Sequence, residues 1–375
     1  MESESWPHEL AAWVAGYGLE GRRVAPSREL TPREWRALRA IVFSQRITGI
    51  AAKAAGSGSL PLPDEAAAEL SADYRDAILL CLVLEQKLLA LAPVFEQAGI
   101  DLVVLKGPAT ARSFYPDPSW RMFGDVDLLV RTNDWRPACA LLAKLGYRRQ
   151  LPEPRPGFDE RFGKSATHVD GEGFQVDLHR KLALGALGLM SEPDELFERT
   201  ATFALEGRSL QRFDDTVSLL HACVHASLGS FPPRLLPLRD VAQIASVGDV
   251  DWGSLAELAK RWNLGAALQH GLSTATDRLV VSMPAKAEPL LTWSASRRER
   301  RLLAAYTTDR RRGGGLTLSM VRGVPGLGSK AAYLRALLFP DRAFLVARAE
   351  QGKGGTYRSR WRVPLRWPGY RAGGR

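Results

Sequence analysis

Two acidic residues, Asp125 and Asp127, stand in the otherwise apolar segment G-D-V-D-L-L-V. The segment has the composition of a strand, and successive side chains of a strand point to opposite faces. Residues two apart share a face, so the two carboxylates are predicted to lie side by side. Two like charges on an apolar strand are costly unless a cation lies between them, and Mg²⁺ prefers oxygen ligands. The pair therefore predicts a site for a divalent cation.

A third acidic residue fits the same site. Asp177 lies in F-Q-V-D-L-H, a second strand-like segment further along the chain. If the two strands are neighbours in one sheet, Asp177 faces the pair and completes a cluster able to hold two metal ions roughly 3.5–4 Å apart. Such ions stabilise the attacking and leaving oxygens of an in-line phosphoryl displacement. The alternative for each acid taken alone is a solvated carboxylate at a strand end.

A strand, a tight turn and a helix precede these acids. The branched aliphatic segment Ile100–Leu105 predicts a short strand, and a helix is predicted from Ala109 to Tyr115. Between them, Gly107 lets the backbone approach a ligand closely, and the free N–H groups there together with Lys106 suit a triphosphate. Arg121 is a second candidate for binding phosphate, because a guanidinium keeps its charge and binds oxygens bidentately. The alternatives are an ordinary turn and a solvated arginine.

These motifs resemble a poorly characterised nucleotidyltransferase family within the polymerase-beta-like superfamily. The resemblance is carried by L-K-G, R-x-x-x-D-x-D-L-L-V, L-G-Y at 145–147 and V-D-L-H at 176–179, and downstream by L-L-H with His225, L-R-D at 238–240 and D-W at 251–252. The wider superfamily usually has a Gly-Gly or Gly-Ser pair where this chain has Lys106-Gly107-Pro108. The hydroxyl that would contact phosphate is absent, so backbone amides, Lys106 or Arg121 are expected to replace it.

The resemblance implies transfer of a nucleoside monophosphate from a nucleoside triphosphate (NTP), with two Mg²⁺ or Mn²⁺ ions. Asp125 and Asp127 would ligate both ions, and Asp177 would ligate the ion that binds the incoming hydroxyl. Pyrophosphate would leave, with Lys106 and Arg121 neutralising its charge. The acceptor is expected to be a hydroxyl on a small molecule or peptide.

Four further residues are candidates for contact with the acceptor. His179 directly follows the predicted strand that carries Asp177. Its side chain faces the same side as Asp177 only if the strand stays regular. His221 and His225 are four apart on a predicted helix and share one face. This spacing can hold a metal, but two histidines offer too few ligands, so a buried hydrogen-bonded role or a wall of the acceptor pocket is favoured. Arg239 is the fourth candidate.

The remaining segments are predicted to position these strands. Helices are expected over Glu9–Tyr17, Thr31–Ile47, Ser71–Gln97, Asn133–Leu145 and Asp214–Leu228, after Pro237 and from Asp251. The proline-rich, charged segment from Gln150 to Lys164 is predicted to be a mobile loop able to cover the site. From about Ser191 onward the pattern turns helical.

We therefore expect an α+β fold, with a small mixed nucleotidyltransferase sheet flanked by helices. The chain has 375 residues, 45% of them hydrophobic, which is enough for two or three packed regions. The expected divisions are an N-terminal helical segment (1–70), a catalytic domain (71–190), a helical C-terminal domain (191–350) and a basic tail (351–375).

The composition also bears on location and cofactors. No apolar run reaches the roughly 18 residues typical of a membrane span, and residues 1–5 lack the features of a signal peptide, so a cytoplasmic protein is expected. Cys81, Cys139 and Cys223 are far apart and set in apolar stretches, which favours neither disulfides nor zinc.

The tail supports an alternative function. Residues 351–375 contain seven basic and no acidic residues, in a chain of net charge +10, with aromatic residues interleaved. Such a composition can bind nucleic acid through phosphates and stacked bases. The other alternative is a catalytically silent nucleotide sensor, against which Asp177 argues, because binding alone does not require a third acid.

Overall fold

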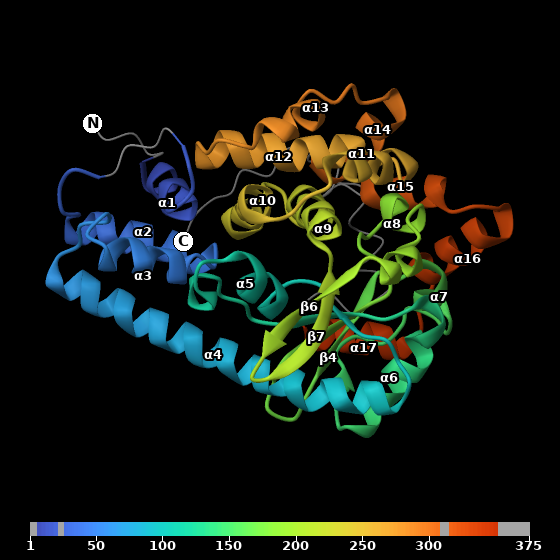
Figure 1. Ribbon diagram of the computed structural model, residues 1–375. Coiled ribbons are helices and arrows are strands. Elements are labelled where there is room, and N and C mark those ends of the chain that lie inside the picture. Colours follow the sequence, from blue (N-terminus) through green and yellow to red (C-terminus); the bar gives the residue numbers. More distant parts are fainter. Residues whose placement is uncertain (1–5, 22–25, 308–314, 352–375) are drawn as a thin grey trace.

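The computed structural model describes residues 6–21, 26–307 and 315–351, and it has the expected α+β architecture (Figure 1). Five strands form one mixed sheet in the order β1-β2-β5-β4-β3. In that order they are β1 (Val103–Val104), β2 (Val126–Leu129), β5 (Gln175–His179), β4 (Ser165–Val169) and β3 (Arg148–Arg149). Strands β2 and β5 run parallel, whereas the other neighbours are antiparallel. The small mixed sheet is thus confirmed, although β1 is shorter than predicted.

The α-helices that the structure describes fall into three groups along the chain. The N-terminal group is α1 (Trp6–Gly16), α2 (Pro32–Ser44), α3 (Thr48–Gly56) and α4 (Asp64–Gln97). The group interleaved with the strands is α5 (Pro108–Phe114), α6 (Trp135–Lys144), α7 (Phe158–Phe162) and α8 (Ala186–Leu189). The C-terminal group is α9 (Asp215–Leu228), α10 (Leu235–Val247), α11 (Trp252–Arg261), α12 (Gly265–Leu279), α13 (Glu288–Leu291), α14 (Arg297–Thr307), α15 (Gly315–Gly323), α16 (Leu327–Leu338) and α17 (Arg342–Glu350).

Both faces of the sheet are covered, so every residue of β2 is buried. Val126 and Leu128 share a hydrophobic core with α4 and α6. Leu129 belongs to a different core, which it shares with the C-terminal helices. Because successive strand residues point to opposite faces, Asp127 lies on the same side as Leu129. Figure 1 shows α4 below the sheet and α9 to α12 above it, so Asp127 is turned toward the helical C-terminal layer.

Helix α4 begins at Asp64, directly after Pro63, and not at Ser71 as predicted. It therefore runs across the boundary expected between residues 70 and 71. By length and composition, α4 is the one described helix that could cross a membrane, and 39% of its most apolar 18-residue window is buried. Glu85 and Lys87 interrupt this window, so no unbroken apolar run reaches about 18 residues, as expected, and the helix passes the test on its mean hydropathy. One such helix is weak evidence, since core helices pass the same test.

The N-terminal helices are held against the C-terminal ones. Residues of α1, α2 and α3 belong to the same hydrophobic core as α9, α10 and α12. The predicted start of α2 is confirmed by a capping box, in which the Thr31 hydroxyl accepts from the Glu34 backbone N–H and the Glu34 carboxylate accepts from the Thr31 N–H. The first helices are therefore an integral part of the packing around the C-terminal layer.

The expectation of helices only after Ser191 is wrong, because β6 (Thr200–Leu205) and β7 (Arg208–Phe213) form an antiparallel hairpin. The turn residues Glu206 and Gly207 both have positive φ, which matches the twist of a two-residue hairpin loop. Three buried apolar residues, Phe203, Leu205 and Leu210, share one face of the hairpin, whereas Phe213 points to the other face and belongs to the core of the C-terminal helices. The first three of them extend the core that lies between the sheet and α4.

The segment predicted as a loop from Gln150 to Lys164 contains helix α7 in its second half. Phe158 and Phe162 are spaced to share one face of that helix, and both rings contact Tyr333 of α16. This aromatic contact fixes the segment against the C-terminal helices. The predicted basic tail lies outside the described residues, apart from Gln351.

Candidate functional site

Three side chains meet on the sheet face that is turned toward the C-terminal helices. They are Asp127 of β2, and Asp177 and His179 of β5. His179 Nε2 lies 3.0 Å from Asp127 Oδ1 and 3.2 Å from Asp177 Oδ2. One candidate ligand atom from each residue lies within 4.8 Å of the other two. The structure therefore brings together two carboxylates and an imidazole from two strands.

The pairing of β2 with β5 explains this convergence. In the parallel register, Asp127 is opposite Asp177 and Leu129 is opposite His179. Because residues two apart share a strand face, Asp177 and His179 point to the same side as Asp127. The expected neighbourhood of the two strands is confirmed, and β5 stays regular to His179. The sequence reading named His179 as an acceptor contact and did not include it among the metal ligands.

Asp125 lies outside this tight group. Strand β2 begins at Val126, so Asp125 sits in the bend before the strand, where the alternation of side chains does not apply. Its carboxylate is 29% exposed, compared with 2% for Asp127, and Asp125 Oδ1 lies 3.6 Å from Arg46 Nη1. A metal-binding role for Asp125 stays a prediction.

Lys106 links the turn after β1 to the acidic cluster. Lys106 Nζ lies 2.8 Å from Asp127 Oδ2. Gly107 has a φ of +62°, a conformation that other residues rarely adopt, and the turn leads directly into α5. A cavity of about 70 Å³ adjoins this turn. It is lined by polar residues that include Arg46, Lys106, Gly107, Asp125, Asp127 and Arg234.

The cluster is a network of opposite charges. Burial would raise the pKa of Asp127, but Lys106 and His179 hold it well below its usual value. Burial would also raise the pKa of Asp177, but the hydrogen bond from His179 lowers it on balance. Burial and Lys164 would lower the pKa of His179, but its two carboxylate partners raise it. The ammonium of Lys106 and the hydrogen bonds of His179 therefore compensate the charges of the two carboxylates.

Arg121 is engaged elsewhere. It is 4% exposed and forms a bidentate ion pair with Asp240 of α10, with Nε 2.8 Å from Oδ1 and Nη2 2.7 Å from Oδ2. The hydroxyl of Tyr115 donates to the same carboxylate at 2.8 Å. The ion pair joins the turn before β2 to the C-terminal helices. Arg121 also lines the small cavity, and its role in binding phosphate stays a prediction.

The structure separates the three other predicted acceptor contacts. His225 lines both the small cavity and a larger one, and burial holds its pKa well below the usual value. His221 is buried with its ring edge-on to Phe213, and burial lowers its pKa to about 3. Arg239 lines neither cavity; its guanidinium donates to the backbone oxygens of Ala15 and Tyr17, and so ties α10 to α1.

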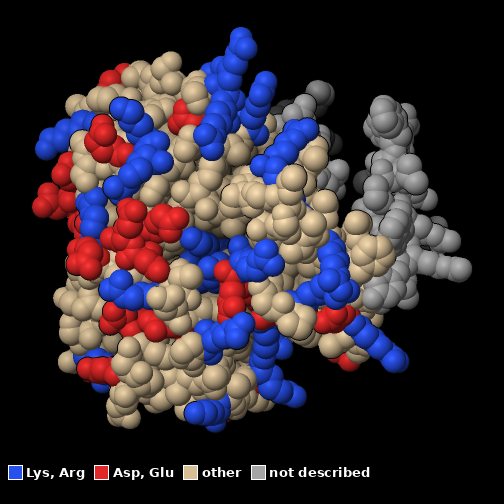
Figure 2. Space-filling view, turned by 90° about the vertical axis from the view of Figure 1, so that its right-hand side faces the viewer, with Lys and Arg blue, Asp and Glu red and all other residues tan. Residues whose placement is uncertain are grey.

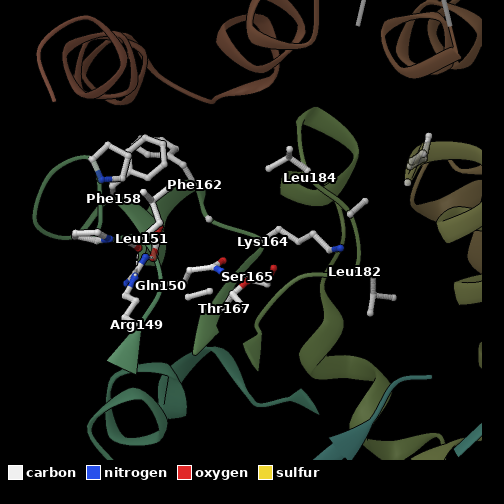
Figure 3. Close-up of a pocket in the computed structure, with 18 of the residues that line it drawn as sticks. Arg149, Gln150, Leu151, Phe158, Phe162, Lys164, Ser165, Thr167, Leu182 and Leu184 are labelled. Carbon is white, nitrogen blue, oxygen red and sulfur yellow. Dashed lines mark hydrogen bonds and ion pairs between the residues drawn. The ribbon is translucent and has the colours of Figure 1, made fainter. Parts of the chain in front are cut away.

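A cavity of about 530 Å³ lies on the other side of the cluster. Ser165 and Thr167 of β4 line it, and their hydroxyls donate to Asp177 at 3.4 and 3.0 Å. Figure 3 shows the Lys164 side chain extending across this cavity toward Leu182. Burial, followed by the charge of Lys106, lowers the pKa of Lys164. The sequence reading missed Lys164, because it ends a segment without motif or periodicity.

The donor set fits a divalent cation. Carboxylate oxygens suit Mg²⁺ and Mn²⁺, and an imidazole nitrogen adds preference for a transition metal. Asp127 Oδ2 is buried and has the ion pair with Lys106 but no well-aligned hydrogen bond, so it can accept a further partner. Asp127, Asp177 and His179 would hold such an ion, with Asp125 beside them.

Fold and site together define an α+β protein with an acidic cluster on two parallel strands of a small sheet. A model of an uncharacterised nucleotidyltransferase family matches residues 31–279, and the chain belongs to that family. The crystal structure of an antigenic nucleotidyltransferase-like protein from Paracoccidioides brasiliensis has 17% sequence identity and a TM-score of 0.30, with 51% of this chain and 92% of that chain covered. So low a TM-score says nothing about activity. No significant match exists among curated proteins.

Proposed function

We propose that the protein transfers a nucleoside monophosphate from an NTP to a hydroxyl of a small molecule or peptide, with release of pyrophosphate and with Mg²⁺ or Mn²⁺. One observation carries the proposal: the carboxylates of Asp127 and Asp177 converge within 4.8 Å of each other, and each has a cavity nearby. The smaller cavity contains Lys106 and Gly107, and the larger one contains the residues that hold Asp177. Membership of the nucleotidyltransferase family supports the reaction class.

The smaller cavity is the proposed site for the phosphates. It is lined by the cationic side chains of Lys106, Arg46 and Arg234, and by Arg121, which is paired with Asp240. Lys106 is placed to bind the departing phosphates, because it lines this cavity and its ammonium pairs with Asp127. Arg46 and Arg234 come from the N-terminal and C-terminal segments, so all three parts of the chain contribute charge. On the face shown in Figure 2, Lys and Arg side chains are widely spread, and net positive charge favours the approach of an anionic substrate.

The proposed step is an in-line displacement at the α-phosphorus. The acceptor oxygen forms a bond to that phosphorus, the bond from phosphorus to the bridging oxygen breaks, and pyrophosphate leaves with the electron pair. Asp177 orients the hydroxyl and helps to remove its proton, because Ser165 and Thr167 fix its carboxylate at the edge of the larger cavity. A bound divalent cation supplies neutralisation of phosphate charge. Exclusion of water by the surrounding helices strengthens these interactions.

The experiment is incubation of the protein with each of the four α-³²P-labelled NTPs, Mg²⁺ or Mn²⁺, and cell extract as the source of acceptor. Asp127→Asn should abolish transfer of label, because it removes one of the two converging carboxylates. Asp249→Asn is the matched control, since Asp249 is exposed and lines neither cavity. The proposal fails if no labelled product forms with wild type, or if the Asp127 variant labels acceptors equally well. Nucleotide binding without transfer would instead favour a silent sensor.

A further inference from the structure

The larger cavity has the dimensions of a small-molecule site. Its volume of about 530 Å³ falls within the range of pockets that enclose drug-sized ligands. It adjoins Asp177 through Ser165 and Thr167, whereas the smaller cavity adjoins Lys106 and Gly107. If the NTP phosphates occupy the smaller cavity, as the proposed function requires, the larger cavity is the described space beside Asp177 in which we place the acceptor. Its chemistry then defines the class of acceptor.

Lys164 presents a charge that the protein leaves unpaired. Among the residues that the structure describes, its ammonium has no ion pair and no hydrogen bond. The two other basic side chains near the acids differ, because Lys106 is paired with Asp127 and Arg46 with Asp125. The Lys164 side chain is half-buried, so part of its hydration is lost and no anion among the described residues replaces it. Such a side chain, extended across a cavity, is typical of a group that awaits an anionic ligand.

The acids do not provide that partner. The charges of Asp127 and Asp177 act on Lys164, but burial and Lys106 outweigh them and lower its pKa. The small cavity does not include Lys164 among its lining residues. The unpaired ammonium therefore serves the larger cavity, on the same side as Asp177.

The opposite wall of the larger cavity is aromatic. Phe158 and Tyr333 stack with ring centres 5.8 Å apart and an interplanar angle of 22°. Phe162 contacts both rings at 5.2 Å, edge-on to Tyr333. Figure 3 shows Phe158 and Phe162 on one side of the cavity and Lys164 on the other. Flat rings of this kind contribute contact area with little loss of side-chain freedom and favour planar apolar ligands.

We propose that the acceptor is a small planar molecule that carries an anionic group close to its reactive hydroxyl. The planar part packs on Phe158, Phe162 and Tyr333, the anion pairs with Lys164, and the hydroxyl faces Asp177. An anion close to the hydroxyl follows because Lys164 lines the same cavity as Ser165 and Thr167, whose hydroxyls hold Asp177. A peptide or nucleic-acid acceptor would require an extended groove instead.

The test uses one ligand pair that differs only in charge. 3-Hydroxy-2-naphthoate and its neutral carboxamide, 3-hydroxy-2-naphthamide, are titrated into the full-length protein in EDTA, with ligand fluorescence as the readout. Wild type should bind the carboxylate at least about tenfold more tightly, because the half-buried ammonium of Lys164 gains a charge-assisted hydrogen bond to it. Lys164→Met should reduce the preference to about threefold or less, and Lys164→Arg should retain most of it. Lys144→Met is the control, because Lys144 is exposed and lines neither cavity.

A further variant tests the aromatic wall separately from the charge. Phe158→Ala should weaken both ligands by a similar factor, since it removes contact area and no charge. Equal binding of the two ligands by wild type overturns the inference, and so does a preference that persists in a folded Lys164→Met protein. Because neither NTP nor metal is present, the binding result is independent of nucleotide transfer. Transfer of label without a charge preference would refute this inference alone, and a charge preference without transfer would refute the proposed function alone.

Discussion

The ion pair between Arg121 and Asp240 makes the strongest stability prediction. The two side chains are 4% and 5% exposed, are joined by two hydrogen bonds, and connect the turn before β2 to α10. Removing one partner of a buried pair leaves an uncompensated charge, which costs about 3–5 kcal/mol. Arg121→Met and Asp240→Asn should each lower the free energy of unfolding by that amount. The double variant removes both charges and keeps an acceptor for Tyr115, so its loss should be well below the sum.

The assay is a double-mutant cycle measured by urea unfolding at constant pH. We expect a coupling free energy of at least about 2 kcal/mol between Arg121 and Asp240. The competing interpretation is the predicted role of Arg121 as a phosphate clamp. Under that interpretation each single variant would lose less than about 1 kcal/mol of stability, as is usual for exposed arginines, while NTP affinity would fall strongly. That pattern would refute the structural role.

Three smaller predictions concern single side chains. The unfolded chain protonates His221 as the pH falls through about 6.5, whereas burial keeps this residue neutral in the folded state down to a pKa of about 3. Its stabilising contribution is thus complete above the unfolded pKa and is lost on acidification, and His221→Gln should reduce the slope of unfolding free energy against pH by about 1.4 kcal/mol per pH unit below that point. Gly49→Ala would place a Cβ 2.4 Å from the Ser119 carbonyl oxygen, and should cost about 1–3 kcal/mol of stability in urea unfolding. Thr31→Ala removes the N-cap of α2 and should cost about 1 kcal/mol, measured as a lowered melting temperature.

Each of these predictions has a clear opposing result. An unchanged pH slope would mean that His221 is protonated in the folded state. Wild-type stability of Gly49→Ala would mean that the backbone at Ser119 can move away freely. An unchanged melting temperature for Thr31→Ala would mean that α2 does not depend on its cap.

The core of the site could be predicted because it depends on local rules. Two apolar strands are each interrupted by an acidic residue, Asp127 and Asp177, and this pattern predicts buried charges. The alternation of strand side chains predicts that both point to the same face. The same rule predicted where His179 points. The rule could not place Asp125, because it applies only within a strand. The strand begins at Val126, one residue after Asp125.

The pairing of Arg121 and the place of Lys164 could not be predicted from local patterns, whereas the hairpin could. The partner of Arg121 lies in a helix more than a hundred residues later in the chain, and no local pattern specifies such a contact. The hairpin of β6 and β7 has a regular alternation and a Glu206-Gly207 turn, which were signals available in the sequence. Lys164 had no such signal, because its significance arises only when the sheet places it beside Asp177. Contacts between distant parts of the chain therefore determine the surroundings of Arg121 and Lys164, and local sequence patterns do not predict such contacts.

The most direct test of the account is Mn²⁺ binding to the cluster, followed by electron paramagnetic resonance of the free ion. We predict that wild type binds Mn²⁺ and that Asp127→Asn and Asp177→Asn each weaken binding by about tenfold or more, because each removes a carboxylate from the converging group. Asp249→Asn should bind as wild type does. Equal affinity in all four proteins, or no binding by wild type, would contradict the claim that these two strands build a metal centre.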